Sequence, residues 1–269
     1  DSESKIIWKN NPIARLKKGN DYLNPDIDII ADESLSKESK YKLSKFLAKW
    51  LTNYINEVLG DLVKLTKYKV ANQYLRGVVF QLYENNGVIK RSEIDKIVKS
   101  IPTGERKKLW GMGVKIGRYH IYLPKMLKPK AVEFRIALWK VFHNLSGINK
   151  IPKSGLNFLI GNNLEKNFYL LCGFEKFREF FVRIDILEKL FLKIIDNTKD
   201  KKFKINAEMM NLLGCSKENF YKLMAYMNYK KDKTVDTYIF KGEKKKKEKI
   251  IRFDKKENPF NKLLSLNIK

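Results

Sequence analysis

The segment VIKRSEIDKIVKSIPTGERKKLWGMGVK (88–115) contains the order of elements that decides the fold. It opens with a short extended piece, after which Ser92 begins a helix that runs to about residue 100. Pro102 ends this helix, because proline cannot continue the helical hydrogen-bond pattern. Thr103 then caps another short helix that ends near Met112. The segment therefore predicts a strand, two short helices and the start of a further strand.

A strand pair is predicted directly after these helices. Residues 114–116 and 119–123 are extended and largely apolar, and Gly117-Arg118 forms the turn between them. A longer helix over about 69–86 precedes the segment and ends in Asn-Asn-Gly, a typical helix C-cap. A helix, two shorter helices and a β-hairpin follow one another in a winged helix-turn-helix.

A similar order occurs a second time in FKINAEMMNLLGCSKENFYKLMAYMNYK (203–230). A helix over 185–197 precedes it, and Asn206 and Ser216 are placed to cap its two short helices. We expect the strand TYIF (237–240) to begin a hairpin that returns through IIRF (250–253). Residue identity between the two segments is low, so the sequence indicates only a weak internal repeat.

The rest of the chain is assigned from hydrophobic periodicity and capping residues. The predicted elements are two strands within 5–18, a strand over 26–34, a helix from Ser36 to about Lys67, a helix over 129–144, a short helix near 164–172 and a strand-like stretch over 174–184. A connection rich in glycine, proline and asparagine lies at 146–157.

Together these patterns predict an α+β protein that is mainly α-helical, with two winged-helix-like units, short β-hairpins and helical connections. We expect four parts: an N-terminal segment with a β-hairpin (1–35), a helical region with the first unit (36–145), the second unit (146–240), and a basic tail with a C-terminal apolar motif (241–269).

The charge of the chain favours a polyanionic partner. Its 269 residues include 56 Lys and Arg against 30 Asp and Glu, for a net charge of +26. Of the basic residues 47 are Lys, so codon drift in an AT-rich genome is an alternative source of part of the excess. Nucleic acid is the polyanion that we favour.

Composition also narrows the class of protein. Aromatic residues make up 12% of the chain, which argues against disorder as its main state. No apolar run is long enough to span a bilayer, so no membrane partner is expected. Cys172 and Cys215 have neither metal-site nor disulfide spacing, which is typical of a reducing compartment, and we expect a cytoplasmic protein. The sequence opens without Met, and we expect it to be part of a longer chain.

The sequence does not indicate an enzyme within this segment. DIDIIADES (26–34) resembles a Walker B strand, but no G-x-x-x-x-G-K-[ST] loop accompanies it. The glycines at 111, 113 and 117 follow a helix and precede a strand, which is the wrong order for a dinucleotide-binding turn. His120 and His143 have no nucleophile or acid at a supportive spacing. We therefore expect no catalytic residue, no metal site and no cofactor here.

Basic residues interleaved with aromatic ones gather at the first predicted hairpin. Lysine and arginine attract phosphates, and exposed aromatic rings can stack on unpaired bases. The candidate nucleic-acid contacts are Lys115, Arg118, Tyr119, His120, Tyr122, Lys125, Lys128 and Lys130 near this hairpin, Lys217 and Lys222 on the helix over 217–227, and Lys244, Lys245, Lys246 and Lys247 in the tail.

Two alternatives apply to these candidates. Strand alternation places Tyr119 on the side of the strand that faces the core, and His120 and Tyr122 on the opposite side. For His120 and Tyr122, the pattern is equally consistent with packing and with contact to a ligand. The run KGEKKKKEK (241–249) is equally consistent with a solvated loop and with non-specific attraction of phosphates.

Several strings, in this order, resemble the C-terminal region of alphaproteobacterial superfamily 2 helicases related to the mitochondrial degradosome RNA helicase. The strings are RGVVFQLYENNGVIKR (76–91), GVKIGRYHIYLPKMLKP (113–129), MMNLLGCSKENF (209–220) and NPFNKLLSL (258–266), with WKNNPIARL and IIADESL (within 8–35) also fitting. The tail here is short and dominated by Lys, and Lys125 stands where that family's pattern has a small apolar residue. These two differences from the family's pattern affect the surface that would contact nucleic acid.

The resemblance implies that two ATP-driven motor domains, which would use ATP and Mg²⁺, lie upstream of this segment. The segment would then bind or guide the strand, with RNA slightly favoured over DNA, or recruit a partner such as a nuclease. No catalytic residue is carried over from the family.

Two other functions stay open at this stage. NPFNKLLSL (258–266) has the apolar spacing of a short amphipathic anchor, which favours a protein-interaction module docking on the helicase core or on a nuclease. An independent winged-helix DNA-binding regulator would have the same order of elements.

Overall fold

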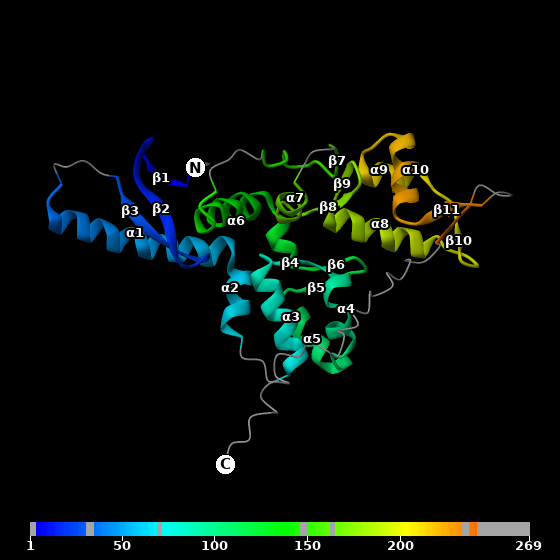
Figure 1. Cartoon of the computed structure of the whole chain (residues 1–269), viewed down its shortest axis with the longest axis horizontal. Helices are drawn as coiled ribbons and strands as arrows, with labels where there is room; N and C mark the ends of the chain where they lie inside the picture. The colour runs from blue at the N-terminus through cyan, green and yellow to red at the C-terminus, as the bar shows by residue number, and fades with distance from the viewer. Residues whose placement is uncertain are drawn as a thin grey trace, which may run out of the picture.

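The computed structural model describes residues 4–30, 35–68, 72–145, 150–161, 165–232 and 237–240. The protein is α+β and mainly α-helical, as predicted, with small antiparallel sheets. The molecule is elongated: the N-terminal sheet lies towards one end, and the last β-strands lie at the other (Figure 1). The helices and hairpin of the first predicted unit project from the middle.

The N-terminal part is a three-stranded sheet packed on two helices. Its elements are β1 (Lys5–Trp8), β2 (Asn11–Asp21), β3 (Asn24–Ile29) and the long helix α1 (Lys37–Val58). The strand order is β1-β2-β3, so β1 and β3 are the outer strands. Helix α1 packs on β3, and α6 (Pro129–Phe142) packs on β2. The predicted hairpin and third strand are therefore confirmed as one antiparallel sheet.

The predicted helix from Ser36 to Lys67 is divided in two. Ser36 caps its start as expected, with its hydroxyl accepting a hydrogen bond from the Ser39 N–H at 3.2 Å. The helix ends at Val58, and α2 (Gly60–Lys67) begins after Leu59. Leu59 leaves the helical backbone region (φ −112°, ψ 21°) and its side chain is fully buried. The break turns α2 towards the core, and the continuous apolar periodicity did not reveal it.

The first winged-helix-like unit is confirmed. It consists of α3 (Gln73–Glu84), β4 (Val88–Lys90), α4 (Arg91–Lys99), α5 (Thr103–Gly111), β5 (Lys115–Ile116) and β6 (His120–Tyr122). Asn86 and Gly87 end α3 with positive φ angles of 56° and 85°. The strand order β4-β6-β5 places the first strand beside the return strand of the hairpin.

The last unit has the same topology. It consists of α8 (Ile184–Asp196), β10 (Lys202–Phe203), α9 (Ala207–Leu213), α10 (Lys217–Tyr226), β11 (Tyr229–Lys231) and β12 (Tyr238–Phe240), in strand order β10-β12-β11. Asn206 and Ser216 cap α9 and α10 as predicted. The hairpin partner of β12 is β11, and the expected return strand over 250–253 lies outside the described residues.

Between these units lies a further sheet, which the sequence did not predict. Its elements are α6, β7 (Phe158–Ile160), α7 (Lys166–Leu171), β8 (Phe174–Phe177) and β9 (Phe180–Arg183), again in the order β7-β9-β8. The stretch 174–184, predicted as one strand, is a hairpin that turns at Arg178, whose φ is 54°. We call these elements the middle unit; residues 146–240 thus contain two sheets.

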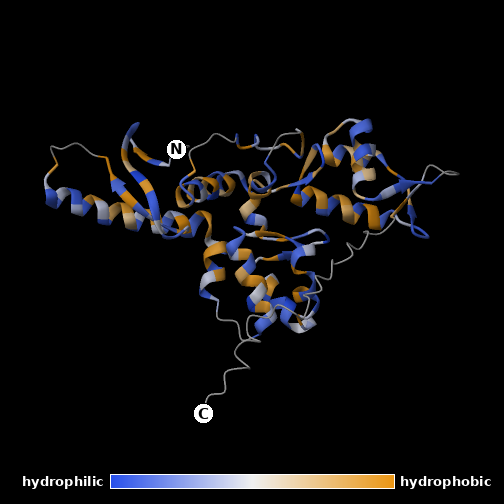
Figure 2. Ribbon diagram, in the orientation of Figure 1, coloured by the Kyte–Doolittle hydropathy of each residue, from blue (hydrophilic) through white to orange (hydrophobic). Residues whose placement is uncertain are grey.

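Apolar side chains fill the spaces between these elements. Figure 2 shows α8 as largely hydrophobic, whereas α1 is more hydrophilic towards its free end. One hydrophobic core is shared by the N-terminal sheet, its helices and the first unit, and another lies within the last unit. Val88, Tyr122 and Ile184 form a small buried cluster where the sheet of the first unit meets the start of α8. The first unit is therefore packed against the elements that follow it.

Candidate nucleic-acid interface at the junction of the units

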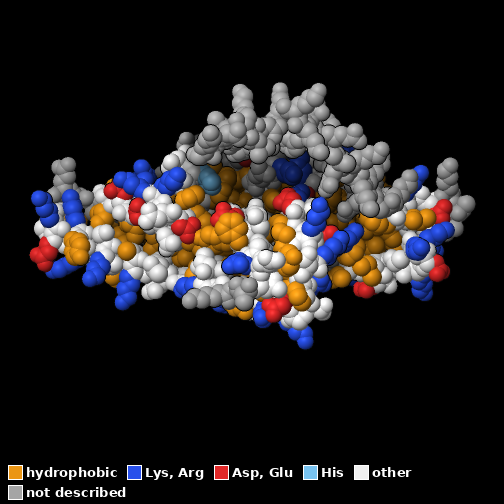
Figure 3. Space-filling model, turned by 60° about the horizontal axis from the view of Figure 1, so that its bottom comes forward, with side chains coloured by type: hydrophobic (Ala, Val, Ile, Leu, Met, Phe, Trp, Pro, Cys, Tyr) orange, Lys and Arg blue, Asp and Glu red, His pale blue; other side chains and the backbone are white. Residues whose placement is uncertain are grey.

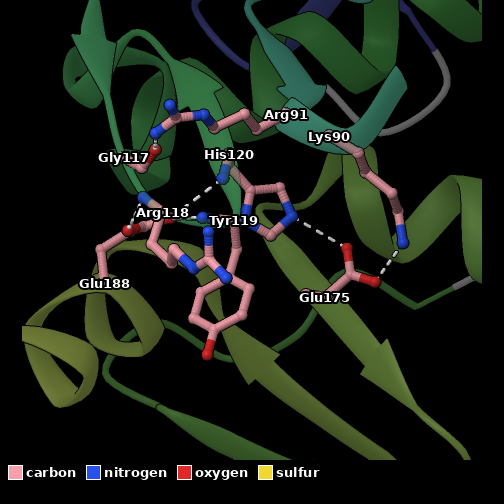
Figure 4. A network of polar contacts seen from close by, with 8 residues as sticks. All are labelled: Lys90, Arg91, Gly117, Arg118, Tyr119, His120, Glu175 and Glu188. Atoms are coloured by element: carbon pink, nitrogen blue, oxygen red, sulfur yellow. Dashed lines mark hydrogen bonds and ion pairs between the residues drawn. The ribbon is translucent and has the colours of Figure 1, made fainter. Parts of the chain in front are cut away.

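The turn between β5 and β6 is held by a carboxylate from another unit. Glu188 of α8 accepts hydrogen bonds from the N–H groups of Arg118, at 2.7 Å, and of Tyr119 and His120, each at 2.9 Å. A Cβ atom on Gly117 would lie 2.4 Å from the Glu188 carboxyl carbon, so only glycine admits this approach. We call Gly117–Tyr119 the wing turn (Figure 4).

His120 connects this carboxylate to a second one. Its Nε2 atom lies 2.8 Å from a carboxylate oxygen of Glu175 in β8, and its Nδ1 atom lies 3.8 Å from Glu188. Lys90 of β4 makes an ion pair with the other oxygen of Glu175. All three units thus contribute to the network in Figure 4. With His120 protonated the two positive and two negative charges balance, which a buried site favours.

The titration of these groups follows from their contacts. Burial alone lowers the pKa of His120, but its hydrogen bond to Glu175 and the nearby Glu188 outweigh burial, so the net pKa lies above its ordinary value. Burial alone raises the pKa of Glu175 and Glu188, but the interactions with His120, together with Lys90 for the former and the wing-turn amides for the latter, lower both pKa values. The network therefore favours the ionised carboxylates and the imidazolium.

This arrangement corrects the expected contact role of two residues. The side chains of His120 and Tyr122 are 1% and 3% exposed, because β8 and α8 cover the face of β6 that alternation had left open. Neither is presented to a ligand, and both hold the units together. Arg118 and Tyr119 lie at the edge of the junction, where Arg118 is exposed and Tyr119 is half-buried.

A cleft of about 420 Å³ opens beside the wing turn. Arg118 and Lys201 are its basic side chains, and Phe191 and Phe240 are among its aromatic ones. The Arg118 guanidinium lies 5.8 Å from the centre of the Phe191 ring, and Tyr119 meets that ring edge to face. Phe240 is 38% exposed. Figure 3 shows hydrophobic side chains beside basic ones at the end of the molecule that carries α8.

Chemically, this wing-turn cleft combines two kinds of binding group. Cationic side chains at its edge can attract phosphates, and an exposed ring can stack on a base. The sequence pointed to Arg118 and Tyr119. It did not point to Lys201, Phe191 or Phe240, which come from the last unit and are brought to the wing turn only by the fold.

The other predicted lysines do not gather at this cleft. Lys125 pairs with Asp61 at 3.2 Å, Lys130 with Glu57 at 2.9 Å and Lys222 with Glu218 at 2.6 Å. Further exposed lysines lie on β5, before α6 and on α10: Lys115, Lys128 and Lys217. Lys244, Lys245, Lys246 and Lys247 lie outside the described residues.

Sequence reasoning also missed a buried arginine at the centre of the molecule. Arg135 of α6 is fully buried and donates hydrogen bonds to the carbonyl groups of Asn86, of Met126 at 2.7 Å and of Leu171 at 3.0 Å. Met126 lies in the short 3₁₀ helix η1 (Pro124–Leu127). Burial lowers the pKa of Arg135 to about 10. An arginine within the apolar run AVEFRIALW was the available signal.

Cysteine and metal chemistry have little support in this part of the chain. Burial raises the pKa of Cys172 to about 12, which disfavours a reactive thiolate. Among the described residues, no group of three or more His, Cys, Asp or Glu side chains is placed to hold a metal ion. In the same ranges, no helix combines the length and the apolar character needed to cross a membrane.

Comparison with known proteins does not assign the chain to a family. No family model matches it, and neither the curated proteins nor the solved structures include a significant match.

Proposed function

We propose that this chain is a nucleic-acid-binding accessory region of an ATP-dependent helicase and that it contacts the strand at the wing-turn cleft. The observation that carries the proposal is the meeting of Arg118 and Lys201 with the exposed ring of Phe240 at the junction of two winged-helix-like units. Cations and an accessible ring in one cleft suit an unpaired nucleotide.

The overall charge supports the same ligand. A net charge of +26 attracts any polyanion, and the release of counterions from phosphates makes such binding sensitive to salt. The cleft adds what diffuse charge cannot supply, namely a place where a base leaves solvent. We therefore favour a single strand over an intact duplex, whose bases are already stacked.

The helicase part of the proposal rests on the resemblance of the ordered sequence strings. In this proposal the motor domains lie in the same polypeptide and supply ATP hydrolysis, while this region guides the strand or recruits a partner such as a nuclease. RNA is slightly favoured over DNA, and the location is cytoplasmic. An independent DNA-binding regulator is the competing function, and it requires preference for a specific duplex.

The test measures binding of a fluorescein-labelled uridine 15-mer to the full chain by fluorescence anisotropy at several salt concentrations. Phe240→Ala should weaken binding by about 1–3 kcal/mol, the usual value of one stacking contact. Lys201→Ala should weaken it and reduce the salt slope by about 1. Lys222→Ala is the matched control, since it removes one exposed lysine outside the cleft.

Equal affinities for all three variants would contradict the cleft as the contact site. Absence of salt-dependent binding to any oligonucleotide would contradict the proposed function as a whole. Preference for one duplex sequence over the single strand would favour the regulator instead.

A further inference from the structure

A second hollow, of about 570 Å³, lies between β1, α1 and α6, away from the wing-turn cleft. We call it the N-terminal groove. Ile6 and Ile7 of β1 form one wall, and Leu51 of α1 and Phe134 of α6 contribute to the others. Most of these side chains are aliphatic, so the groove offers apolar surface rather than a set of directed hydrogen bonds.

The strand that borders the groove is an outer strand of its sheet. In the order β1-β2-β3, β1 pairs only with β2 among the described residues. Ile7 is 49% exposed, and the neighbouring Trp8 is also exposed. An outer strand with exposed apolar side chains can pair with an added strand, and many peptide-binding domains recognise extended ligands in this way.

The charged residues around the groove define the chemistry of the added strand. Its lining includes Lys5, Lys130 and Lys140 against one acid, Glu133. Lys130 pairs with Glu57, and Lys140 adds a further positive charge to the rim of the groove. A ligand with apolar side chains flanked by carboxylates would match both the apolar walls of the groove and its positive rim.

The aromatic residues of the groove favour a polypeptide over a nucleic acid. Trp50 and Tyr54 stack on each other, with ring centres 5.4 Å apart and planes 13° apart. Tyr54 also contacts the edge of Phe134, and the Lys130 ammonium lies 5.1 Å from its ring centre. Because Tyr54 already contacts Trp50, Phe134 and Lys130, its ring offers little room for stacking a base.

We propose that the N-terminal groove binds an extended segment of a partner polypeptide, rich in aliphatic and acidic residues, which adds a strand beside β1. This interaction is independent of nucleic-acid binding, because the two sites share no residue. It gives the partner-recruiting role a defined location and a defined ligand chemistry.

The test titrates the full chain into three fluorescein-labelled peptides and follows anisotropy. The first probe is Asp-Glu-Val-Glu-Ile-Glu-Val-Asp, and the second has lysine in place of every acid. The third is the acidic peptide methylated at alternate backbone nitrogens, which prevents strand pairing. We expect only the first to bind, and its binding should persist when an unlabelled uridine 15-mer is present.

Two variants locate the site. Ile7→Asp and Lys140→Glu should each weaken binding of the acidic peptide about tenfold or more, because one adds a charge to the apolar wall and the other reverses the rim charge. Ile160→Asp is the matched control, as Ile160 is 61% exposed on β7, an outer strand of another sheet. Melting temperatures of all three should match the unaltered chain, since each side chain replaced is at least partly exposed.

Three results would overturn the proposal. These are equal binding of the lysine and acidic peptides, an unchanged affinity in both groove variants, and displacement of the peptide by the oligonucleotide. The last would assign the groove to nucleic acid. Loss of oligonucleotide binding in the Phe240→Ala chain with peptide binding retained would show that the two sites are separate.

Discussion

The hairpins of the first and last units share one topology but have different surroundings. In the first, the wing turn is bound by Glu188, and His120 behind it is buried. In the last, Lys230 and Lys231 of β11 are exposed, and Phe240 of β12 opens into a cleft. Basic and aromatic residues in a hairpin therefore do not identify a binding wing by themselves. What decides is whether another unit covers that hairpin.

The largest loss of stability is expected when the carboxylate that covers the first hairpin is removed. Glu188→Ala leaves the N–H groups of Arg118, Tyr119 and His120 without their acceptor. Removing one partner of a buried charged network costs about 3–5 kcal/mol in the free energy of unfolding. Urea unfolding followed by circular dichroism measures this. Glu218→Ala, on the exposed side of α10, should leave the midpoint unchanged. Equal losses in both variants would contradict a stabilising role specific to Glu188.

A smaller loss should come from the wing turn itself. Gly117→Ala places a methyl group against the Glu188 carboxyl, and crowding of this kind costs about 1–3 kcal/mol. Gly111→Ala is the matched control, because no atom lies within 4 Å of its added Cβ. We expect the control to be neutral or stabilising. A neutral Gly117→Ala in the same unfolding experiment would contradict the close approach of α8.

The buried network should also make stability depend on pH. The pKa of His120 is raised in the folded state, so its contribution is present below the ordinary pKa of about 6.5 and is lost as pH rises through the folded value. The lowered pKa values of Glu175 and Glu188 act oppositely, and their contribution is lost as pH falls through those folded values. The junction is thus most stable between these two ranges.

Measuring the free energy of unfolding at about pH 6 and about pH 8 tests the role of His120. Its contribution to that free energy changes by less than about 1.4 kcal/mol per pH unit. His120→Gln should remove this part of the slope, whereas His143→Gln, at an exposed position after α6, should retain it. An unchanged slope in the His120 variant would assign the pH dependence to other groups.

The smallest effect on stability is expected from the tip of the first hairpin. Arg118→Ala removes the cation next to Phe191 and should change the free energy of unfolding by only about 0.5–1 kcal/mol. It should still weaken binding of the uridine 15-mer, because Arg118 lines the cleft. Lys115→Ala, on the same hairpin but outside the cleft lining, should weaken binding less. The reverse order would place the contact on the sheet of the first unit.

Local signals explain what could be predicted from the sequence. Asn206 and Ser216 cap their helices where the sequence indicated, because caps act within a few positions. Thr103, predicted as a cap, is instead the first residue of α5, and Pro102 occupies the cap position. The hairpin at Arg178 was missed, since Arg-Glu is not a typical turn pair and the aromatic residues on both sides suggested one strand. The break at Leu59 was missed because the apolar periodicity continues across it, although Gly60 directly after it was an available signal.

The site was only partly predictable. Arg118 could be found from the basic and aromatic pattern, but its cleft partners are supplied by chain segments about 70 or more residues away. A signal for Glu188 did exist, since this acid falls on the apolar stripe of α8 with Ile184 and Phe191. An acid on an apolar stripe indicates a buried partner, but the sequence does not say which one.

The distance between the wing turn and its carboxylate affects how the protein is made. Glu188 lies 70 residues after Arg118 in the chain. At the usual 5–20 residues per second, a ribosome adds those residues in about 4–14 s, longer than most local helices and hairpins need to form. During that interval the amides of the wing turn can bond only to water or to an earlier part of the nascent chain. A fragment that ends after the first unit would remain in this incomplete state, so the junction between units becomes complete only late in synthesis.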